Sequence, residues 1–290
     1  MLHYVFLLLG CITCILQFFS LEAVLDGRVT PIYLENRYTF TNFEWARGNV
    51  YFKNGFDLPF GGTVILDINQ EVGADIRMMN GTLRLNGNLA FSHDASLTGS
   101  GFIDAQNKAI SFKNDWVIKA NERFIILSPV TFFGVGSNRL SLAQTGNTGG
   151  ISVKNGVSEI RFSRLGFTTS YSFNFTTASG APNVLSFQDC SFLLLANLKL
   201  NSNLVVFNGN ITLLKSDRTL EIVNSLRVDF GTTIHVQSQV TLKVSLILAS
   251  EESSQLILDN ARLSYTPTGT YSLFFSRSYT GGPHQGSLVV

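Results

Sequence analysis

The feature that most constrains this chain is an apolar pair that returns every 20 or 21 residues between positions 165 and 248. The members of the pair lie two residues apart, and each forms a column with steps of 20, 20, 21 and 20 residues. The first column is Leu165, Leu185, Val205, Leu226 and Leu246, and the second is Phe167, Phe187, Phe207, Val228 and Leu248. A fixed period of this length is typical of repeat proteins, and residues two apart share one face of a strand. The sequence therefore predicts an all-β fold, a parallel β-helix (β-solenoid) with coils of 20–21 residues.

A polar column accompanies the apolar pair. Asn183, Asn203 and Asn224 each stand two residues before a member of the first column. Because residues two apart on a strand point to the same side, we expect these amides on the core side. There each amide would bond to its neighbour along the axis, as in stacked cross-β structures. An outward-facing strip of amides that recognises a ligand is the alternative.

A second apolar series precedes this region and is out of phase with it. Its members follow at steps of 21, 21 and 20 residues, and they are Phe91, Phe112, Phe133 and Val153. Val153 and Phe167 are only 14 residues apart. Either a shortened coil lies near 154–164, or the two series occupy different faces of one continuous coil. We expect one continuous coil, because alternating strand patterns run through without a linker.

The domain organisation follows from where the columns begin and end. Residues 24–62, with Pro31 and Trp45, fit no column, and we expect an irregular, aromatic-rich N-terminal cap that covers the first coil. Residues 63–265 are expected to form the solenoid coils. Residues 266–290 are polar and broken by Gly and Pro, which predicts a C-terminal tail or an incomplete cap.

The N-terminal segment predicts export. Residues 2–19 contain no charged side chain and run into a small-residue site at Ala23, so we expect a signal peptide over residues 1–23. A retained N-terminal anchor is the alternative, because about 18 apolar residues can just span a bilayer. The chain after this segment keeps one cysteine, Cys190, which predicts a core residue and no intrachain disulfide. The expected localisation is secreted or cell surface.

The charge balance excludes one class of partner. The chain has 21 Lys and Arg against 20 Asp and Glu, and only 14% of its residues are charged. Nucleic acids need clustered cations to neutralise phosphate, so nucleic acid is not an expected partner. Contact with a membrane is expected only through the N-terminal segment, if it is uncleaved. The remaining partners are an unknown surface, a glycan or another copy of the chain.

Two segments resemble a known class of repeat. Gly81-Thr-Leu-Arg-Leu-Asn-Gly-Asn-Leu89 and Leu97-Thr-Gly-Ser-Gly-Phe-Ile-Asp104 resemble coils of secreted right-handed parallel β-helix proteins, including bacterial surface and autotransporter-passenger-like proteins. The resemblance covers most of 60–265 and consists of the coil pattern, with no invariant residue. It implies an adhesin, a surface-layer component or a polysaccharide-cleaving enzyme. A leucine-rich-repeat pattern over 195–203 is a second possibility, but it occurs once.

The candidate catalytic residues are His93, Asp94 and Asp115. Asp94 and Asp115 are 21 residues apart, one coil, so they are expected on the same face. Polysaccharide lyases and hydrolases use such carboxylates to hold calcium or as acid and base. The chain has no Asn-Thr-Asp, Asp-Asp or Gly-His-Gly motif. We therefore expect an exported structural or interaction module, adhesin-like or surface-layer-like, with no catalysis, cofactor or metal. A lyase or glycoside hydrolase on the same scaffold is the alternative.

Overall fold

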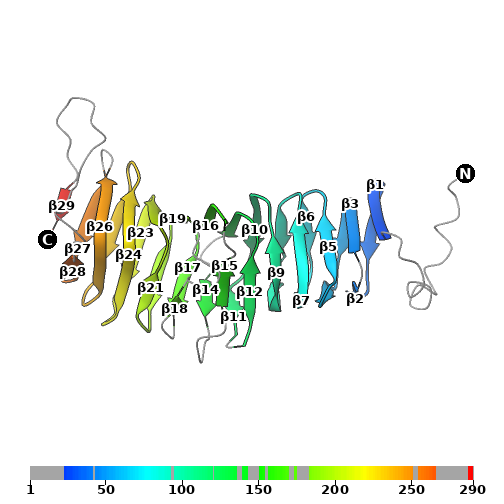
Figure 1. Cartoon of the computed structure of the whole chain (residues 1–290), viewed down its shortest axis with the longest axis horizontal. Coiled ribbons are helices and arrows are strands. Elements are labelled where there is room, and N and C mark those ends of the chain that lie inside the picture. The colour runs from blue at the N-terminus through cyan, green and yellow to red at the C-terminus, as the bar shows by residue number, and fades with distance from the viewer. Residues whose placement is uncertain are drawn as a thin grey trace, which may run out of the picture.

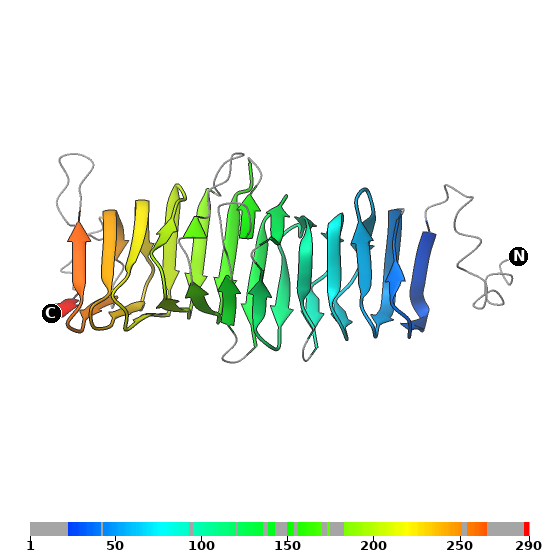
Figure 2. The ribbon, with the colours of Figure 1, turned by 90° about the horizontal axis from the view of Figure 1, so that it is seen from below.

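The molecule is a long rod whose strands lie across its long axis (Figure 1). The computed structural model describes residues 23–41, 43–92, 95–119, 121–135, 139–142, 150–153, 156–169, 173–174, 183–250, 254–265 and 287–289. Within these ranges every regular element is a strand, and the strands form a 21-stranded and an 8-stranded sheet. Neighbouring strands pair in parallel from one coil to the next, and the chain advances steadily from one end to the other (Figure 2). The predicted parallel β-solenoid is confirmed.

Each coil contributes strands to three faces, here named A, B and C in chain order. Face A contains the first parts of β1 (Ala23–Leu34) and β3 (Phe43–Phe52), β5 (Thr63–Leu66), the second parts of β7 (Ile76–Leu85) and β9 (Leu97–Asp104), β12 (Arg123–Ile126), β15 (Gly150–Val153), β18 (Phe173–Asn174), β21 (Leu198–Leu200), the first parts of β24 (Thr219–Val228) and β26 (Thr241–Ser250), and β28 (Arg262–Tyr265).

Faces B and C complete the coil. Face B contains the second parts of β1, β3, β24 and β26, with β6 (Gln70–Val72), β8 (Leu89–Phe91), β10 (Lys108–Phe112), β13 (Val130–Gly134), β16 (Glu159–Ser163), β19 (Val184–Gln188) and β22 (Leu204–Asn208). Face C contains β2 (Tyr38–Thr39), β4 (Phe56–Pro59), the first parts of β7 and β9, β11 (Trp116–Ile118), β14 (Arg139–Leu142), β17 (Gly166–Thr169), β20 (Ser191–Leu194), β23 (Asn210–Leu214), β25 (Thr233–Val236), β27 (Gln255–Leu258) and β29 (Ser287–Val289).

The central members of both predicted columns stack in register on face B. The paired residues are Leu185 with Val205, Val205 with Leu226, Phe187 with Phe207, and Phe207 with Val228. All six side chains are buried. The apolar period of the sequence therefore reports a true axial repeat in this part of the rod.

The first members of the columns lie on another face. Phe167 belongs to β17 on face C, where it pairs with Leu140 and Phe192, and Leu165 directly precedes this strand. The true predecessors on face B are Ile160 and Phe162. The prediction for Leu165 and Phe167 is wrong because the coil between β16 and β19 is longer than 20 residues. Counting 20 residues back from Phe187 on face B therefore leads to Phe167 on face C, and not to Phe162 on face B.

The last members are shifted by one position. Leu246 pairs with Ser225 and Leu248 with Arg227, whereas Leu226 pairs with Ile247. The cause is a register irregularity in the β24–β26 pairing after Ile222. The predicted placement of Leu246 and Leu248 in the two columns is therefore wrong. An extra residue at a bulge changes the register, and a fixed step along the sequence cannot detect it.

The second apolar series does occupy different faces of one continuous coil. Phe91 pairs with Phe112 on face B, as expected, but Phe112 then pairs with Gly134. Phe133 is half-buried on the outward side, while its neighbour Phe132 is fully buried. Val153 lies in β15 on face A. The phase difference between the two series is therefore a change of face and does not require a shortened coil.

Aromatic rings stack through the central part of the core, from Phe91 to Phe207. On face B the ring centroids of Phe162 lie 5.5 Å from those of both Phe132 and Phe187, and Phe187 lies 5.9 Å from Phe207. Phe167 of face C meets Phe187 edge-on at 5.4 Å. Such pairs contribute about 0.5–1.5 kcal/mol each beyond burial. Stacking of neighbouring coils therefore stabilises the centre of the rod.

The N-terminal region is already part of the solenoid. The first part of β1 pairs with β3, and β2 pairs with β4, all in parallel. The prediction that residues 24–62 fit no column is therefore wrong, because Phe40, Phe52 and Phe56 pack against one another and extend the hydrophobic core into these coils. The irregular feature that remains is a register break in β1 after Gly27.

The two ends of the chain are described only in part. Residues 1–22, which hold the predicted signal peptide, lie outside the described residues. Across the described ranges, no helix has the length and apolar character needed to cross a membrane. Ser287–Val289 forms β29 and pairs with β27, so part of the predicted C-terminal tail adds a strand to face C.

Candidate functional site

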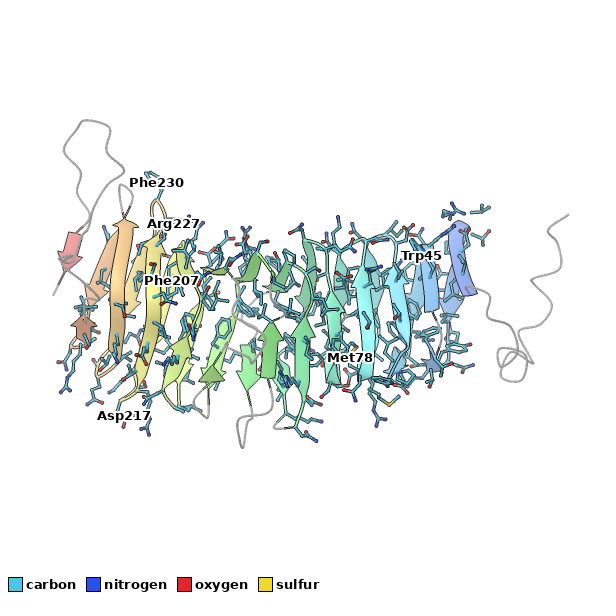
Figure 3. All side chains as sticks on the ribbon, in the orientation of Figure 1. Trp45, Met78, Phe207, Asp217, Arg227 and Phe230 are labelled. Atoms are coloured by element: carbon cyan, nitrogen blue, oxygen red, sulfur yellow. The ribbon has the colours of Figure 1, made fainter. Side chains whose placement is uncertain are left out.

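A groove of about 260 Å³ lies on the outward side of face B, across β16, β19, β22 and β24. We call it the face-B groove. Its lining residues are Glu159, Arg161, Val184, Ser186, Phe187, Gln188, Val206, Asn208, Arg227 and Asp229. Figure 3 shows Phe207 within the body of the rod and Arg227 near its upper edge. The groove therefore lies over the in-register strands β19, β22 and β24.

Strand alternation builds the floor of the groove. Phe187 and Phe207 point into the core, so Ser186 and Val206 between them and their neighbours point outward. Both outward residues are nevertheless buried, with 8% of Ser186 and 3% of Val206 exposed. The floor is thus a small hydroxyl beside an apolar branched side chain, and larger side chains flank both.

An ion pair stands at each end of this floor. Arg161 contacts Glu159 at 3.2 Å, and Arg227 contacts Asp229 at 2.7 Å. Ser186 Oγ donates a hydrogen bond to Glu159 Oε1 at 2.6 Å, which fixes that carboxylate against the floor. Two arginines and two carboxylates leave the groove with no net formal charge. Each end offers guanidinium donors beside carboxylate acceptors.

The register sets the distance between the two ends. Arg161 pairs with Ser186, Ser186 with Val206, and Val206 with Arg227. Three steps of ~4.8 Å separate the two ion pairs by about 14 Å along the axis. Glycosidase carboxylates lie roughly 5–9.5 Å apart. Glu159 and Asp229 are therefore too far apart to serve as the two carboxylates of a glycoside hydrolase.

Amides border the groove on both sides. Gln188 and Asn208 pair with each other at the ends of β19 and β22. Asn183 and Asn203 stand directly before the same two strands, and Asn203 Nδ2 donates to Asn183 Oδ1 at 3.2 Å. Amide residues of neighbouring coils therefore lie side by side on both sides of the floor, and in the Asn183–Asn203 pair the two side chains are hydrogen-bonded.

The predicted position of the asparagine column is wrong. Asn183, Asn203 and Asn224 are exposed, and Asn224 Nδ2 donates to the backbone oxygen of Ser202 instead of to an amide. The first two precede their strands, at a corner of the coil where strand alternation does not apply. Asn224 lies inside the bulged part of β24. The amide contact predicted between Asn183 and Asn203 is present, but on the surface.

Exposure of the column predicts a small effect of Asn203→Ala on stability. Both asparagines are exposed, so water can replace the hydrogen bond that is lost between their side chains. We therefore expect a change of about 0.5 kcal/mol or less in the unfolding free energy. Gln70→Ala is the matched control, because the buried Gln70 amide donates to the Gly48 carbonyl oxygen at 2.6 Å. Leaving that carbonyl oxygen without its hydrogen bond should lower the unfolding free energy by about 1–3 kcal/mol. Thermal melting of both variants checks this, and equal losses would contradict it.

The predicted catalytic residues are only partly described. His93 and Asp94 lie outside the described residues, so their relation to Asp115 stays a prediction. Asp115 is exposed between β10 and β11, where its Oδ1 accepts a hydrogen bond from the backbone N–H of Arg139 at 2.8 Å. It therefore joins neighbouring coils. No group of three or more His, Cys, Asp or Glu in the described part of the chain could hold a metal ion.

A second groove of about 470 Å³ lies on face C beside β7 and β9. Its carboxylates already accept hydrogen bonds from backbone N–H groups. Asp75 Oδ1 accepts from the N–H of Ser96 at 2.7 Å, and Glu122 accepts from Gly99 at 2.8 Å and Lys119 at 2.9 Å. These bonds hold corners of the coil together, so the larger groove is a weaker candidate than the face-B groove.

Cys190 is a core residue, as predicted. Its side chain is buried between β19 and β20. Burial raises the pKa of the thiol to about 12. The buried thiol therefore stays protonated at physiological pH, which makes it a poor nucleophile because the thiolate is the reactive form.

No protein-family model, no curated protein and no solved structure gives a significant match to this chain. The fold itself therefore defines the class, a parallel β-solenoid repeat protein. Apart from Phe187, the groove residues were not singled out from the sequence. The signal that could have found them is the set of outward positions between stacked apolar residues, Arg161, Ser186, Val206 and Arg227.

Proposed function

We propose that this protein is an exported, adhesin-like interaction module that binds a saccharide chain in the face-B groove without cleaving it. The observation that carries the proposal is the groove itself, in which Arg–carboxylate pairs and amides surround a small, partly apolar floor. Saccharide hydroxyls both donate and accept hydrogen bonds, and their C–H faces are apolar. Guanidinium, carboxylate and amide groups meet the polar need, and Val184 and Val206 supply the apolar part of the lining.

The charge of the groove favours an uncharged saccharide. Arg161 and Arg227 are already paired with Glu159 and Asp229, so neither is left to neutralise a phosphate or sulfate. A nucleic acid would require cations that are not balanced by carboxylates. Export is supported by the apolar residues 2–19 of the sequence. An extracellular or cell-surface location would bring the groove into contact with glycans.

The carboxylate spacing favours binding over hydrolysis. The strands that carry Glu159 and Asp229 lie about 14 Å apart along the axis, which exceeds the carboxylate spacing that a shared glycosidic bond allows. A cleaving enzyme on the same scaffold would need a carboxylate pair elsewhere. The proposal therefore predicts that bound saccharides are recovered intact, with or without added calcium.

The test is binding of the purified full chain to an array of neutral oligosaccharides, followed by calorimetry on those retained. Arg227→Ala removes one charged donor from the groove and should weaken binding about tenfold or more. The matched control is Arg218→Ala, which breaks the Arg218–Asp217 ion pair at 3.1 Å. Asp217 lies at the opposite edge of the rod from Arg227 (Figure 3).

Both variants should melt like the wild type, because each loses only an exposed ion pair. Weaker binding by Arg227→Ala alone supports the face-B groove as the site. Absence of any retained saccharide, equal binding by the two variants, or release of shortened products would each contradict the proposal.

A further inference from the structure

We infer that the ligand of the face-B groove is a long linear saccharide chain that runs along the rod axis and meets a second binding site at Tyr33 and Tyr51. This inference rests on the proposed function and extends it from a single groove to the whole outward side of face B. It is carried by an exposed aromatic pair that lies in line with the groove.

Tyr33 and Tyr51 form a stacked pair on the surface of the first two coils. Their ring centroids are 4.9 Å apart and their planes differ by 13°. Tyr33 is 64% exposed and Tyr51 38%. A centroid distance of 4.9 Å is larger than face-to-face contact, so the rings are offset and part of each face reaches solvent. An exposed aromatic face with a phenolic hydroxyl suits the apolar face and the hydroxyls of a sugar ring.

The tyrosines belong to the same outward column as the groove amides. Neighbour by neighbour, the column is Tyr33, Tyr51, Glu71, Ala90, Ser111, Phe133, Ser163, Gln188 and Asn208. Six steps of ~4.8 Å place Tyr51 about 29 Å from Gln188 along the axis. One extended chain lying along face B could therefore touch both sites.

The column between the two sites carries mostly small side chains and one charged residue, Glu71. Ala90 and Ser111 have small side chains, and the exposed Glu71 is paired with Lys113 at 2.9 Å. Phe133 is half-buried under the guanidinium of Arg164, 5.7 Å from its ring centroid. Glu71 is thus the one charged residue of the column itself, and its charge is paired. The Arg164 guanidinium, which covers part of the Phe133 ring, offers hydrogen-bond donors to saccharide hydroxyls between the tyrosines and the groove.

Two sites on one ligand predict a dependence on chain length. A saccharide bound in the groove presents its next units to the tyrosines at high effective concentration, but only if it spans the gap. Short oligosaccharides should therefore bind with the affinity of the groove alone. Affinity should rise by about tenfold or more once the chain reaches Tyr51.

The experiment measures affinity of the full chain for cello-, xylo- and manno-oligosaccharides from disaccharide to octasaccharide. The test variant is Tyr33→Ala with Tyr51→Ala, and the control is Phe60→Ala, an exposed aromatic in the turn after β4. We expect the double tyrosine variant to bind short chains normally and to lose the gain shown by long chains. The Phe60→Ala variant should keep the gain in affinity for long chains. Tyr33→Ala alone is the second variant if the double variant melts lower than the wild type.

The outcomes separate this inference from the proposed function. If Arg227→Ala weakens binding but the tyrosine variants keep the length dependence, the two-site inference is overturned and the groove stands. An equal loss on short and long chains in the tyrosine variants also overturns it. If no oligosaccharide binds, the proposed function fails first, and the inference fails with it.

Discussion

Phe187→Asp is expected to unfold the central coils of the rod. Phe187 is fully buried, and its ring contacts those of Phe162, Phe167, Phe192 and Phe207. Removing a buried phenylalanine costs about 3–5 kcal/mol by itself. A carboxylate in its place must be buried without a partner or be protonated, which adds several kcal/mol. Because each coil is stabilised by its neighbours, we expect the loss to spread along the stack.

Thermal melting and the yield of folded protein check this expectation. Leu195→Asp is the matched control, because Leu195 is 50% exposed and the same change there buries no charge. It should melt within a few degrees of the wild type. Phe187→Ala serves as a milder variant if the aspartate form gives no folded protein. Wild-type melting of Phe187→Asp would mean that the aromatic stack does not stabilise the rod.

Gly55→Ala is expected to destabilise the protein much more than Gly61→Ala. Both glycines have positive φ, +65° and +80°, so an alanine at either position costs about 1–2 kcal/mol of backbone strain. A Cβ on Gly55 would lie 2.1 Å from the carbonyl oxygen of Asp75 in the next coil. Nothing lies within 4 Å of a Cβ on Gly61. Relieving the clash at Gly55 requires a backbone shift and should add about 1–3 kcal/mol.

Denaturant unfolding of the two variants isolates this difference, because they share the backbone strain and differ in the space around the added methyl group. Similar losses in both would show that the next coil can move away from position 55 without cost. A larger loss for Gly55→Ala would show that the spacing of neighbouring coils, set by strand pairing, limits the side chains allowed at the turns.

The candidate site was much harder to predict than the fold. Ser186 and Val206 form the floor of the groove, yet on the sequence they are merely the residues between core positions. Arg161 and Arg227 are 66 positions apart, and only the pairing of β16, β19, β22 and β24 brings them to one groove. The 20-residue spacing of Asn183 and Asn203 correctly predicted their contact, but both residues lie at a corner of the coil, where their side chains point outward.

The sequence by itself determined the class of fold and its period. A return of apolar residues every 20–21 positions, as in Leu185, Val205 and Leu226, can bury a continuous core only if successive coils stack in parallel. Which residues share a face was decided by the tertiary structure. The longer coil before Val184 moved Phe167 to face C, and a bulge in β24 shifted the partners of Leu246 and Leu248. Pairing follows backbone hydrogen bonds between neighbouring coils, so one extra residue at a corner or bulge changes the face without changing the apolar pattern.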